Sequence, residues 1–473
     1  MVNQTTHNVF RISKSVTLLY LFCIIVEVLF TLKIQIFYLY SGLFILSSIF
    51  ISLIIAQWSK QVSEKTFLTV TTLTTFIYGL LLIWISSQVA IYEIGTPFVG
   101  LDDAIYDEQQ RQIAKNIRTF HEISSQTLMS GFYSGYPNFG GILMYLFGSD
   151  SWWIPRIANI FLHSMSLPLF YSIIKHYSST SGAKIASILF GLSPIFLTYA
   201  IFQMKDSNII FLVLLIFILI RNILKGERIV LSIAIAIPTL AALIFYRAMI
   251  ILALVISILL SVLFSGTGKK KVFSTAAVSV LVVGVFILWG YISSSGLATG
   301  YNDYFGRRLT LLGDEERLAG GGSTLTESGY GSLVSAPLFI TMSPLLPIPG
   351  AILFEDPKYP STNLNFSGNL FLYAILPLAL IGAFWTFKRR KEAGFPFLIL
   401  LFFFVYKIGS AISGMTIWSY RQNMPATLTL LMLLPIGLDT MMTKQENRAR
   451  KLILLLSYFL IFIWSGFRYI IRL

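Results

Sequence analysis

The sequence has few charged residues and almost no cysteine. Only 12% of its 473 residues are Asp, Glu, Lys or Arg, whereas soluble domains carry about 25%. Because 56% of the residues are hydrophobic, the chain cannot bury all of its apolar surface internally, and lipid must be part of its solvent. The single cysteine, Cys23, lies in an apolar segment and excludes an intramolecular disulfide.

Signatures of several common site classes are also missing. The four histidines (His7, His121, His163 and His176) are scattered and have no metal-ligand spacing. No nucleotide-type glycine loop follows a strand, and the glycines at 320–322 are not followed by Lys-Ser or Lys-Thr. No small-residue cleavage site follows the first apolar run, so we interpret that run as a retained membrane span. No internal repeat and no separate soluble domain is evident.

Long apolar runs dominate the chain. Runs of about 18 to 25 residues predict an all-α, polytopic membrane protein of about 13 transmembrane helices, forming one transmembrane domain over residues 1–473. The predicted spans are 15–32, 37–57, 67–90, 154–171, 183–202, 209–220, 229–245, 248–264, 272–292, 370–387, 395–412, 428–442 and 452–469.

The net charge of +14 predicts topology rather than nucleic-acid binding. Basic residues gather in short connections such as 269–271 and 388–391, which is the signal for the cytoplasmic side. Two long segments, 91–153 and 293–369, then face outside the cytoplasm, and we expect the second to be partly mobile or re-entrant. The expected location is the cell membrane, most simply a bacterial inner membrane.

An acidic stretch begins the first outer segment. Asp102, Asp103, Asp107 and Glu108 place four carboxylates within seven residues of a very apolar sequence. Residues 103–120 are amphipathic, with Ile105, Ile113 and Ile117 expected on one face of an interfacial helix and Asp107 and Glu108 on its solvated face. The ordinary interpretation is a solvated loop or helix cap. The alternative is a catalytic loop at the membrane surface.

Other ionisable residues lie at the predicted outer ends of spans. The predicted topology brings them to the same face as Asp102, where cations suit a phosphate anion and a carboxylate suits deprotonation of an attacking hydroxyl or amine. Singly, each cation is equally explained as a snorkelling interface anchor, and Lys205 with Asp206 as a local ion pair. These residues are Arg156, Lys205, Asp206, Arg247, Lys407 and Arg421.

Short motifs in order along the chain resemble a known family. Leu101-Asp102-Asp103-Ala104-Ile105-Tyr106 resembles the Asp-Glu-x-x-Tyr signature in the first large outer loop of membrane glycosyltransferases of the C fold. Protein O-mannosyltransferases and the aminoarabinose transferase that modifies lipid A belong to that group. Similar segments follow: Tyr136-Pro137-Asn138, Arg156 opening a span, Ser193-Pro194 before Lys205-Asp206-Ser207, and Tyr420-Arg421 before Pro425.

The resemblance implies a glycosyltransferase C fold, a polyprenyl-phosphate-linked sugar as donor, and Asp102 as general base. It implies that Asp103 assists through a divalent metal ion (Mg or Mn), with Asp102 and Asp103 as its ligands. The cations Lys205, Arg247, Arg421 and Arg156 would bind the donor phosphate, and the remaining site residues would be Asp206, Tyr106, Tyr136, Tyr246 and Tyr420.

The chain also departs from the family. Asp103 stands where the family has Glu, and the outer loop follows the third predicted span, which requires two additional N-terminal spans. We also expect no counterpart of the large C-terminal soluble domain that some members carry.

The predicted function is transfer of a sugar from a polyprenyl phosphate to a glycan, lipid or protein acceptor at the outer membrane face. One alternative is a polymerase or ligase of lipid-linked glycans, for which Arg421 and Arg247 would matter more than Asp102. The other is a transporter or flippase of a lipid-linked precursor, which predicts an internal repeat and charges near mid-span.

Overall fold

The computed structural model describes residues 36–98, 101–130, 134–264, 375–412 and 420–442, together with Leu455, Leu456 and Phe459. Regular structure in this part of the chain is entirely α-helical. The helices are α2 (Ile36–Trp58), α3 (Glu64–Ile94), α4 (Leu101–Phe120), α5 (Gly135–Leu146), α6 (Trp153–Ile174), α7 (Thr180–Leu192), α8 (Pro194–Ile201), α9 (Asp206–Lys225), α10 (Ile229–Arg247), α11 (Met249–Phe264), α17 (Arg390–Ala393), α18 (Phe395–Ile412) and α19 (Tyr420–Met442). A further helix spans Ile375–Lys388.

Six of the described helices are long and apolar enough to cross a membrane. Four shorter apolar helices accompany them: Gly42–Trp58, Met249–Phe264, Ile375–Lys388 and Phe395–Ser410. These helices confirm the predicted all-α architecture for the described residues and indicate a membrane protein. The predicted spans at 15–32 and 272–292, most of the span at 452–469, and the outer segment 293–369 lie outside the described residues. The total of about 13 spans therefore stays a prediction.

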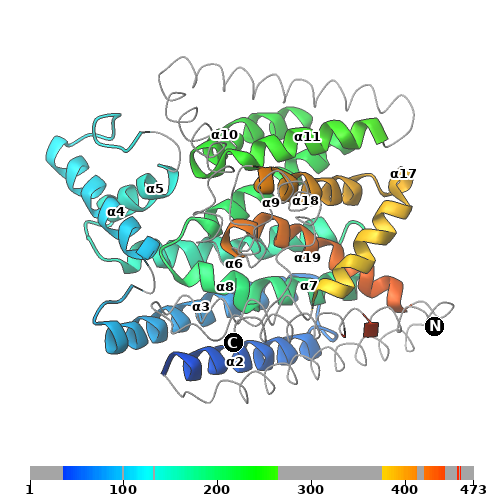
Figure 1. The fold of residues 1–473 in the computed structure, drawn as a ribbon, viewed down its shortest axis with the longest axis horizontal. Helices are drawn as coiled ribbons and strands as arrows, with labels where there is room; N and C mark the ends of the chain where they lie inside the picture. The colour runs from blue at the N-terminus through cyan, green and yellow to red at the C-terminus, as the bar shows by residue number, and fades with distance from the viewer. Residues whose placement is uncertain are drawn as a thin grey trace, which may run out of the picture.

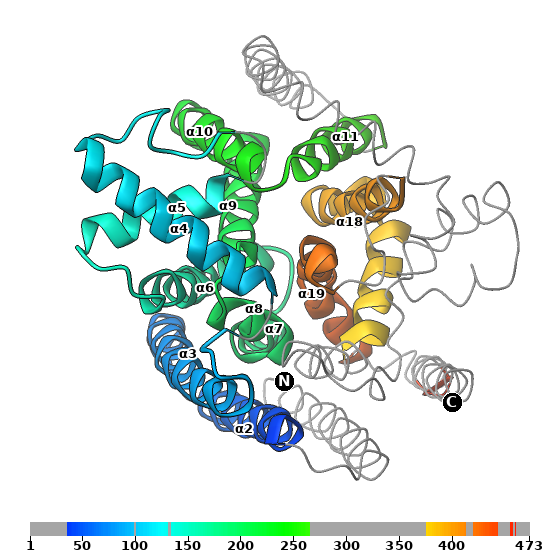
Figure 2. The ribbon, with the colours of Figure 1, turned by 60° about the vertical axis from the view of Figure 1, so that its left-hand side comes forward.

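The long helices lie side by side, and α4 and α5 lie across one end of the bundle (Figure 1). α17 lies at the opposite end (Figure 1). Figure 2 shows α4 running from near the middle of the bundle end, where the helix begins, to the rim, where it ends. We call this the α4 end of the bundle, and the opposite one the α17 end.

Basic side chains hold the short connections together at the α17 end. Lys175, after α6, forms an ion pair with Glu64 at the start of α3. Lys184 in α7 donates to the carbonyl oxygens of Ser59 and Val62, at 2.6 and 3.2 Å. These contacts satisfy carbonyl groups that the end of α2 leaves without helical partners. The charges that predicted topology therefore also join the helix ends.

The apolar run predicted as the span 183–202 is broken at Pro194. α7 ends at Leu192, Ser193 is extended, and Pro194 is the first residue of α8. Proline suits a first helical position because its missing N–H would have no intrahelical partner there. Every residue of α8 is buried, so the α7–α8 unit lies within the protein interior and its C-terminal end leads directly into segment 202–205.

The predicted amphipathic stretch forms a helix, α4, whereas its place at the membrane interface stays a prediction; two details of its faces were wrong. Ile105 is 40% exposed, and Asp107, expected on the solvated face, is only 4% exposed. The buried positions recur every three or four residues, as one helical face requires, and that face begins polar and becomes apolar. Its buried residues are Asp103, Asp107, Gln110, Ile113, Ala114 and Ile117.

Two adjacent glycines allow α5 to lie close against α4. A Cβ atom on Gly140 would be 2.2 Å from the side chain of Gln110, and one on Gly141 would be 2.6 Å from that of Ile113. Only a residue without a side chain fits such an approach. The glycines therefore explain why α4 is supported mainly by α5 rather than by a membrane span.

Candidate functional site

A fully buried ion pair fixes the start of α4. Asp103 and Arg156 are both 0% exposed, and the Arg156 Nη2 donates to Asp103 Oδ2 at 2.8 Å. The same guanidinium donates to Ser87 Oγ at 3.1 Å and to the carbonyl oxygen of Pro97 at 2.9 Å. Its carbon lies 4.5 Å from the ring centroid of Trp152. The pair therefore joins α3, α4 and α6 at the α4 end.

These contacts argue against the phosphate-binding and metal-binding roles predicted for Arg156 and Asp103, and those roles stay predictions. Arg156 is enclosed by protein groups, so its guanidinium does not reach a donor phosphate. The other carboxylate oxygen of Asp103 accepts the backbone N–H of Gln203 at 2.8 Å. Because both oxygens already bind donors, and one of those donors is a cation, Asp103 does not fit the predicted divalent metal site. Among the described residues no group of three or more metal-ligating side chains converges.

Gln203 connects this face of α4 to the interior. Its Nε2 donates to Gln110 Oε1 at 2.6 Å and to Asp107 Oδ1 at 3.1 Å. Asp107 also accepts the Nε of Arg111 at 2.6 Å. Gln203 thus contacts three successive positions of the buried α4 face, counting its bond to Asp103. Segment 202–205, in which it lies, is a short connection between α8 and α9, and the sequence offered no motif that marks Gln203.

An asparagine in α6 continues the polar network. The Nδ2 of Asn159 lies 2.8 Å from the carbonyl oxygens of Phe202 and Met204 and 2.9 Å from the hydroxyl of Tyr136. Its Oδ1 accepts from Asn208 at 3.0 Å. Burial raises the pKa of the Tyr136 phenol well above its ordinary value, so the phenol stays neutral and able to donate. Asn159 therefore ties α5, α6, α9 and segment 202–205 together.

A second buried ion pair lies where α9 begins and α10 ends. Arg247 Nη2 lies 3.4 Å from Asp206 Oδ1, and both residues are at most 5% exposed. Arg247 also donates to the hydroxyl of Tyr406 at 3.3 Å. The neighbouring Tyr246 hydroxyl lies 3.5 Å from Asn208 Oδ1, which links this pair to the network around Asn159. Asp206 and Arg247 are therefore in contact with each other, and Tyr246 belongs to the adjoining network.

Lys407 adds a buried cation next to Tyr406. It is 2% exposed, and its Nζ donates to Asn423 Oδ1 at 2.7 Å. An ammonium has three N–H donors, and among the described residues no carboxylate forms an ion pair with this one. A buried amine with a single amide partner at the α4 end can bind an anion, because the anion would stabilise its charged form.

The other predicted site residues have different environments. Asp102 is exposed in the first turn of α4, and Lys205 is buried with 6% exposure. The ring of Tyr106 packs edge-on against Tyr136, with 5.1 Å between centroids. Tyr420 and Arg421 open α19, and their side chains lie outside the described part of the structure. Of the two adjacent aspartates, Asp102 is thus the exposed one and Asp103 the buried, structural one.

We call the buried polar residues at this end the polar cluster. Sequence reasoning identified its charged members but missed the neutral ones that connect them. Amides and phenols in apolar helices are the signal that was available, since buried polar groups in a membrane bundle need partners. The polar cluster comprises Asp103, Asp107, Gln110, Tyr136, Arg156, Asn159, Gln203, Lys205, Asp206, Asn208, Tyr246, Arg247, Tyr406, Lys407 and Asn423.

Comparison with known proteins gives no family: no protein-family model matches the chain, and no curated protein matches it.

Proposed function

We propose that this chain is an integral membrane glycosyltransferase. It moves a sugar from a polyprenyl phosphate to a hydroxyl or amine of a glycan, lipid or protein acceptor. The observation that carries the proposal is the pairing of an exposed carboxylate, Asp102, with a polar cluster that holds three buried cations, Lys205, Arg247 and Lys407, at the same end of a helical bundle. Transfer with phosphate as the leaving group requires an acid–base group together with groups that bind the phosphate anion.

Asp102 is the proposed general base. As the acceptor oxygen or nitrogen attacks the anomeric carbon, Asp102 takes its proton. The bond between that carbon and the phosphate oxygen breaks, and its electron pair leaves with the polyprenyl phosphate. Asp103, the next residue, is held at both oxygens, so the first turn of α4 cannot drift away from segment 202–205. Preorganisation of this kind keeps the base in position without a conformational cost during the reaction.

The buried cations are the proposed phosphate contacts. Of the three, Arg247 is already paired with Asp206 and Tyr406, and Lys407 is held by one neutral amide. Lys407 therefore has more donor capacity left for a phosphate oxygen than Arg247 has. A developing negative charge is stabilised most strongly by such donors where water is excluded.

The polar cluster lies at the ends of the apolar helices, which is the level expected for the phosphate of a donor anchored in the bilayer. Arg247 is the last residue of α10 and Asp206 the first of α9, so their charges lie at the ends of apolar helices. Headgroup phosphates lie at the ends of membrane spans, whereas the prenyl chain stays among them. The polar cluster can thus meet the phosphate without moving the lipid out of the membrane.

The test is transfer by purified protein offered a panel of polyprenyl-phosphate sugars, with product detected by mass. We expect Asp102→Asn to abolish transfer, because the amide cannot accept the proton, while the variant remains folded and membrane-inserted. Glu108→Gln is the matched control, since it removes an exposed carboxylate from the same helix and should leave transfer unchanged. Full transfer by Asp102→Asn would overturn the mechanism.

A polymerase or ligase of diphosphate-linked glycans is the second candidate, and the buried Arg247 also suits that donor. The two candidates differ in which residue matters more. For a ligase, Arg421→Ala should abolish product and Asp102→Ala should reduce it only partly. For a monophosphate-dependent transferase the order is reversed.

A further inference from the structure

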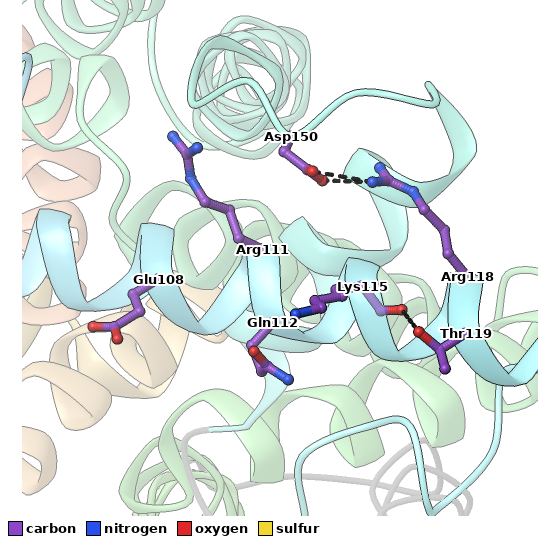
Figure 3. Close-up of a pocket in the computed structure, with 7 residues that line it drawn as sticks. All are labelled: Glu108, Arg111, Gln112, Lys115, Arg118, Thr119 and Asp150. Atoms are coloured by element: carbon purple, nitrogen blue, oxygen red, sulfur yellow. Dashed lines mark hydrogen bonds and ion pairs between the residues drawn. The ribbon is translucent and has the colours of Figure 1, made fainter.

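The outward side of α4 forms a shallow pocket with the turn before α6. The pocket has a volume of about 380 Å³ and is lined by Glu108, Arg111, Gln112, Lys115, Arg118, Thr119 and Asp150. Figure 3 shows the side chains of Arg111 and Arg118 pointing towards the turn that carries Asp150. This pocket is separate from the polar cluster, which lies on the buried side of the same helix.

Arg118 builds the wall of the pocket. Its Nη1 lies 2.9 and 3.0 Å from the two carboxylate oxygens of Asp150, and its Nη2 donates to the carbonyl oxygen of Met144. These contacts hold the turn after α5 against the last turns of α4. Both terminal nitrogens of Arg118 therefore already have acceptors, so Arg118 holds the wall of the pocket in place and does not supply donors for a ligand.

Arg111 and Lys115 supply the donors. Arg111 uses its Nε for Asp107, and among the described residues its two terminal nitrogens bind no acceptor. Lys115 is exposed, and its ammonium has no described partner either. A planar guanidinium and an ammonium one helical turn apart suit the oxygens of a phosphate group.

The surroundings of the pocket are apolar and aromatic. Phe147 is 71% exposed, Leu146 66% and Phe120 58%. Trp152 and Trp153 stack at 4.5 Å immediately after the turn. Tryptophan belts and exposed apolar side chains beside cations mark the headgroup level of a bilayer, not a water-filled groove. In Figures 1 and 2 the C-terminal end of α4 lies at the rim of the bundle, where bilayer lipid would begin.

We propose that this pocket binds the phosphate of an anionic phospholipid from the surrounding leaflet, with Arg111 and Lys115 as its ligands. The apolar rim receives the acyl chains, and the bound lipid anchors α4 at the membrane surface. This site goes beyond the proposed transfer reaction and does not depend on it.

The test measures lipid retained by the purified full chain in native mass spectrometry. Dioleoyl-phosphatidylglycerol is the probe, and dioleoyl-phosphatidylcholine is the control of equal chain length. We expect phosphatidylglycerol to be retained preferentially. Because a basic residue near an anionic lipid contributes about 1 kcal/mol, or about fivefold, Lys115→Gln should weaken retention about fivefold, and Arg111→Gln with Lys115→Gln by more than tenfold.

Three further variants test whether lipid retention depends on this pocket and not on the positive charge of the protein in general. Lys115→Arg should retain the lipid, because the charge stays. Glu108→Gln should increase retention, because it removes a carboxylate from the pocket. Lys65→Gln with Lys391→Gln removes two exposed cations at the α17 end and should preserve most retention. An equal fall in this control, or unchanged retention in the Arg111–Lys115 variant, would overturn the proposal.

Discussion

At the scale of single residues, two adjacent aspartates of the acidic stretch have different environments and different roles. Asp103 is buried and doubly held, whereas Asp102 one residue earlier is exposed. Successive residues of a helix project about 100° apart, so a helix lying over a polar interior must separate them in this way. One aspartate anchors the helix and thereby leaves the other accessible.

The anchoring pair should dominate local stability. Arg156→Met leaves Asp103 as a lone buried charge, and loss of one partner of a buried pair costs about 3 to 5 kcal/mol. We expect this variant to unfold at a clearly lower temperature in detergent, measured by size-exclusion chromatography after heating. Asp103→Leu with Arg156→Met removes both charges and should recover much of that loss. Equal stability of wild type and Arg156→Met would contradict this assignment.

Lys407 should behave in the opposite way. Lys407→Met removes a buried cation that has one amide partner, so the protein should unfold at the same temperature as wild type or higher. If Lys407 binds the donor phosphate, the KM for the polyprenyl-phosphate sugar should rise by roughly tenfold or more, since a hydrogen bond to a charged group contributes about 1.5 to 3 kcal/mol. Unchanged KM together with lower stability would identify Lys407 as purely structural.

At the scale of elements, the helix at Ile375–Lys388 and α19 pack closely because each has a glycine facing the backbone of the other. A Cβ atom on Gly437 in α19 would lie 2.0 Å from the carbonyl oxygen of Leu378, and one on Gly382 would lie 2.1 Å from that of Leu433. Small residues permit such close backbone approach in membrane bundles. The helix at Ile375–Lys388 and α19 are therefore packed backbone to backbone.

That packing predicts a position-specific effect of a single methyl group. Gly437→Ala places its Cβ against backbone, which cannot give way, and should cost about 1 to 3 kcal/mol by overpacking. Gly42→Ala is the control, because nothing lies within 4 Å of a Cβ atom there. Thermal unfolding of the two variants should differ, with Gly437→Ala the less stable; comparable stability would argue against the close contact.

The sequence predicted elements better than it predicted their faces. Apolar run length located α3, α6, α9 and α10, and Pro194 located the break between α7 and α8. Assigning Asp107 to solvent failed because charge was used as a guide to exposure. The partner that buries Asp107 is Gln203, about 100 residues away and inside a span-end connection. Contacts between residues so distant in sequence cannot be predicted from local periodicity. The roles of Asn159, Tyr406 and Asn423 depend on such contacts and were missed for the same reason.

At the scale of the whole molecule, the helices alternate in direction, and this alternation brings the polar cluster to one end. α8 and α10 end, and α6, α9 and α19 begin, at the α4 end (Figure 1). Basic connections such as the one after α9 lie at the α17 end. The distribution of Lys and Arg predicts that the α17 end is cytoplasmic.

Cysteine labelling tests that orientation. With Cys23→Ser as background, the chain has no other cysteine, so Glu108→Cys and Lys391→Cys each give one thiol at one end. In sealed right-side-out vesicles, a membrane-impermeant maleimide should label Glu108→Cys directly. Lys391→Cys should react only after permeabilisation. The reverse pattern would invert the topology and place the polar cluster on the cytoplasmic side.

The buried pair of Asp103 and Arg156 also constrains how the chain is assembled. The two residues are 53 positions apart, and Arg156 belongs to α6, which is synthesised after α4 and α5. Until α6 enters the membrane, Asp103 has no guanidinium to neutralise it. Docking of α4 therefore cannot be complete before α6 has been synthesised, and a nascent chain that stops before α6 leaves Asp103 without its ion-pair partner even where α5 already packs against α4.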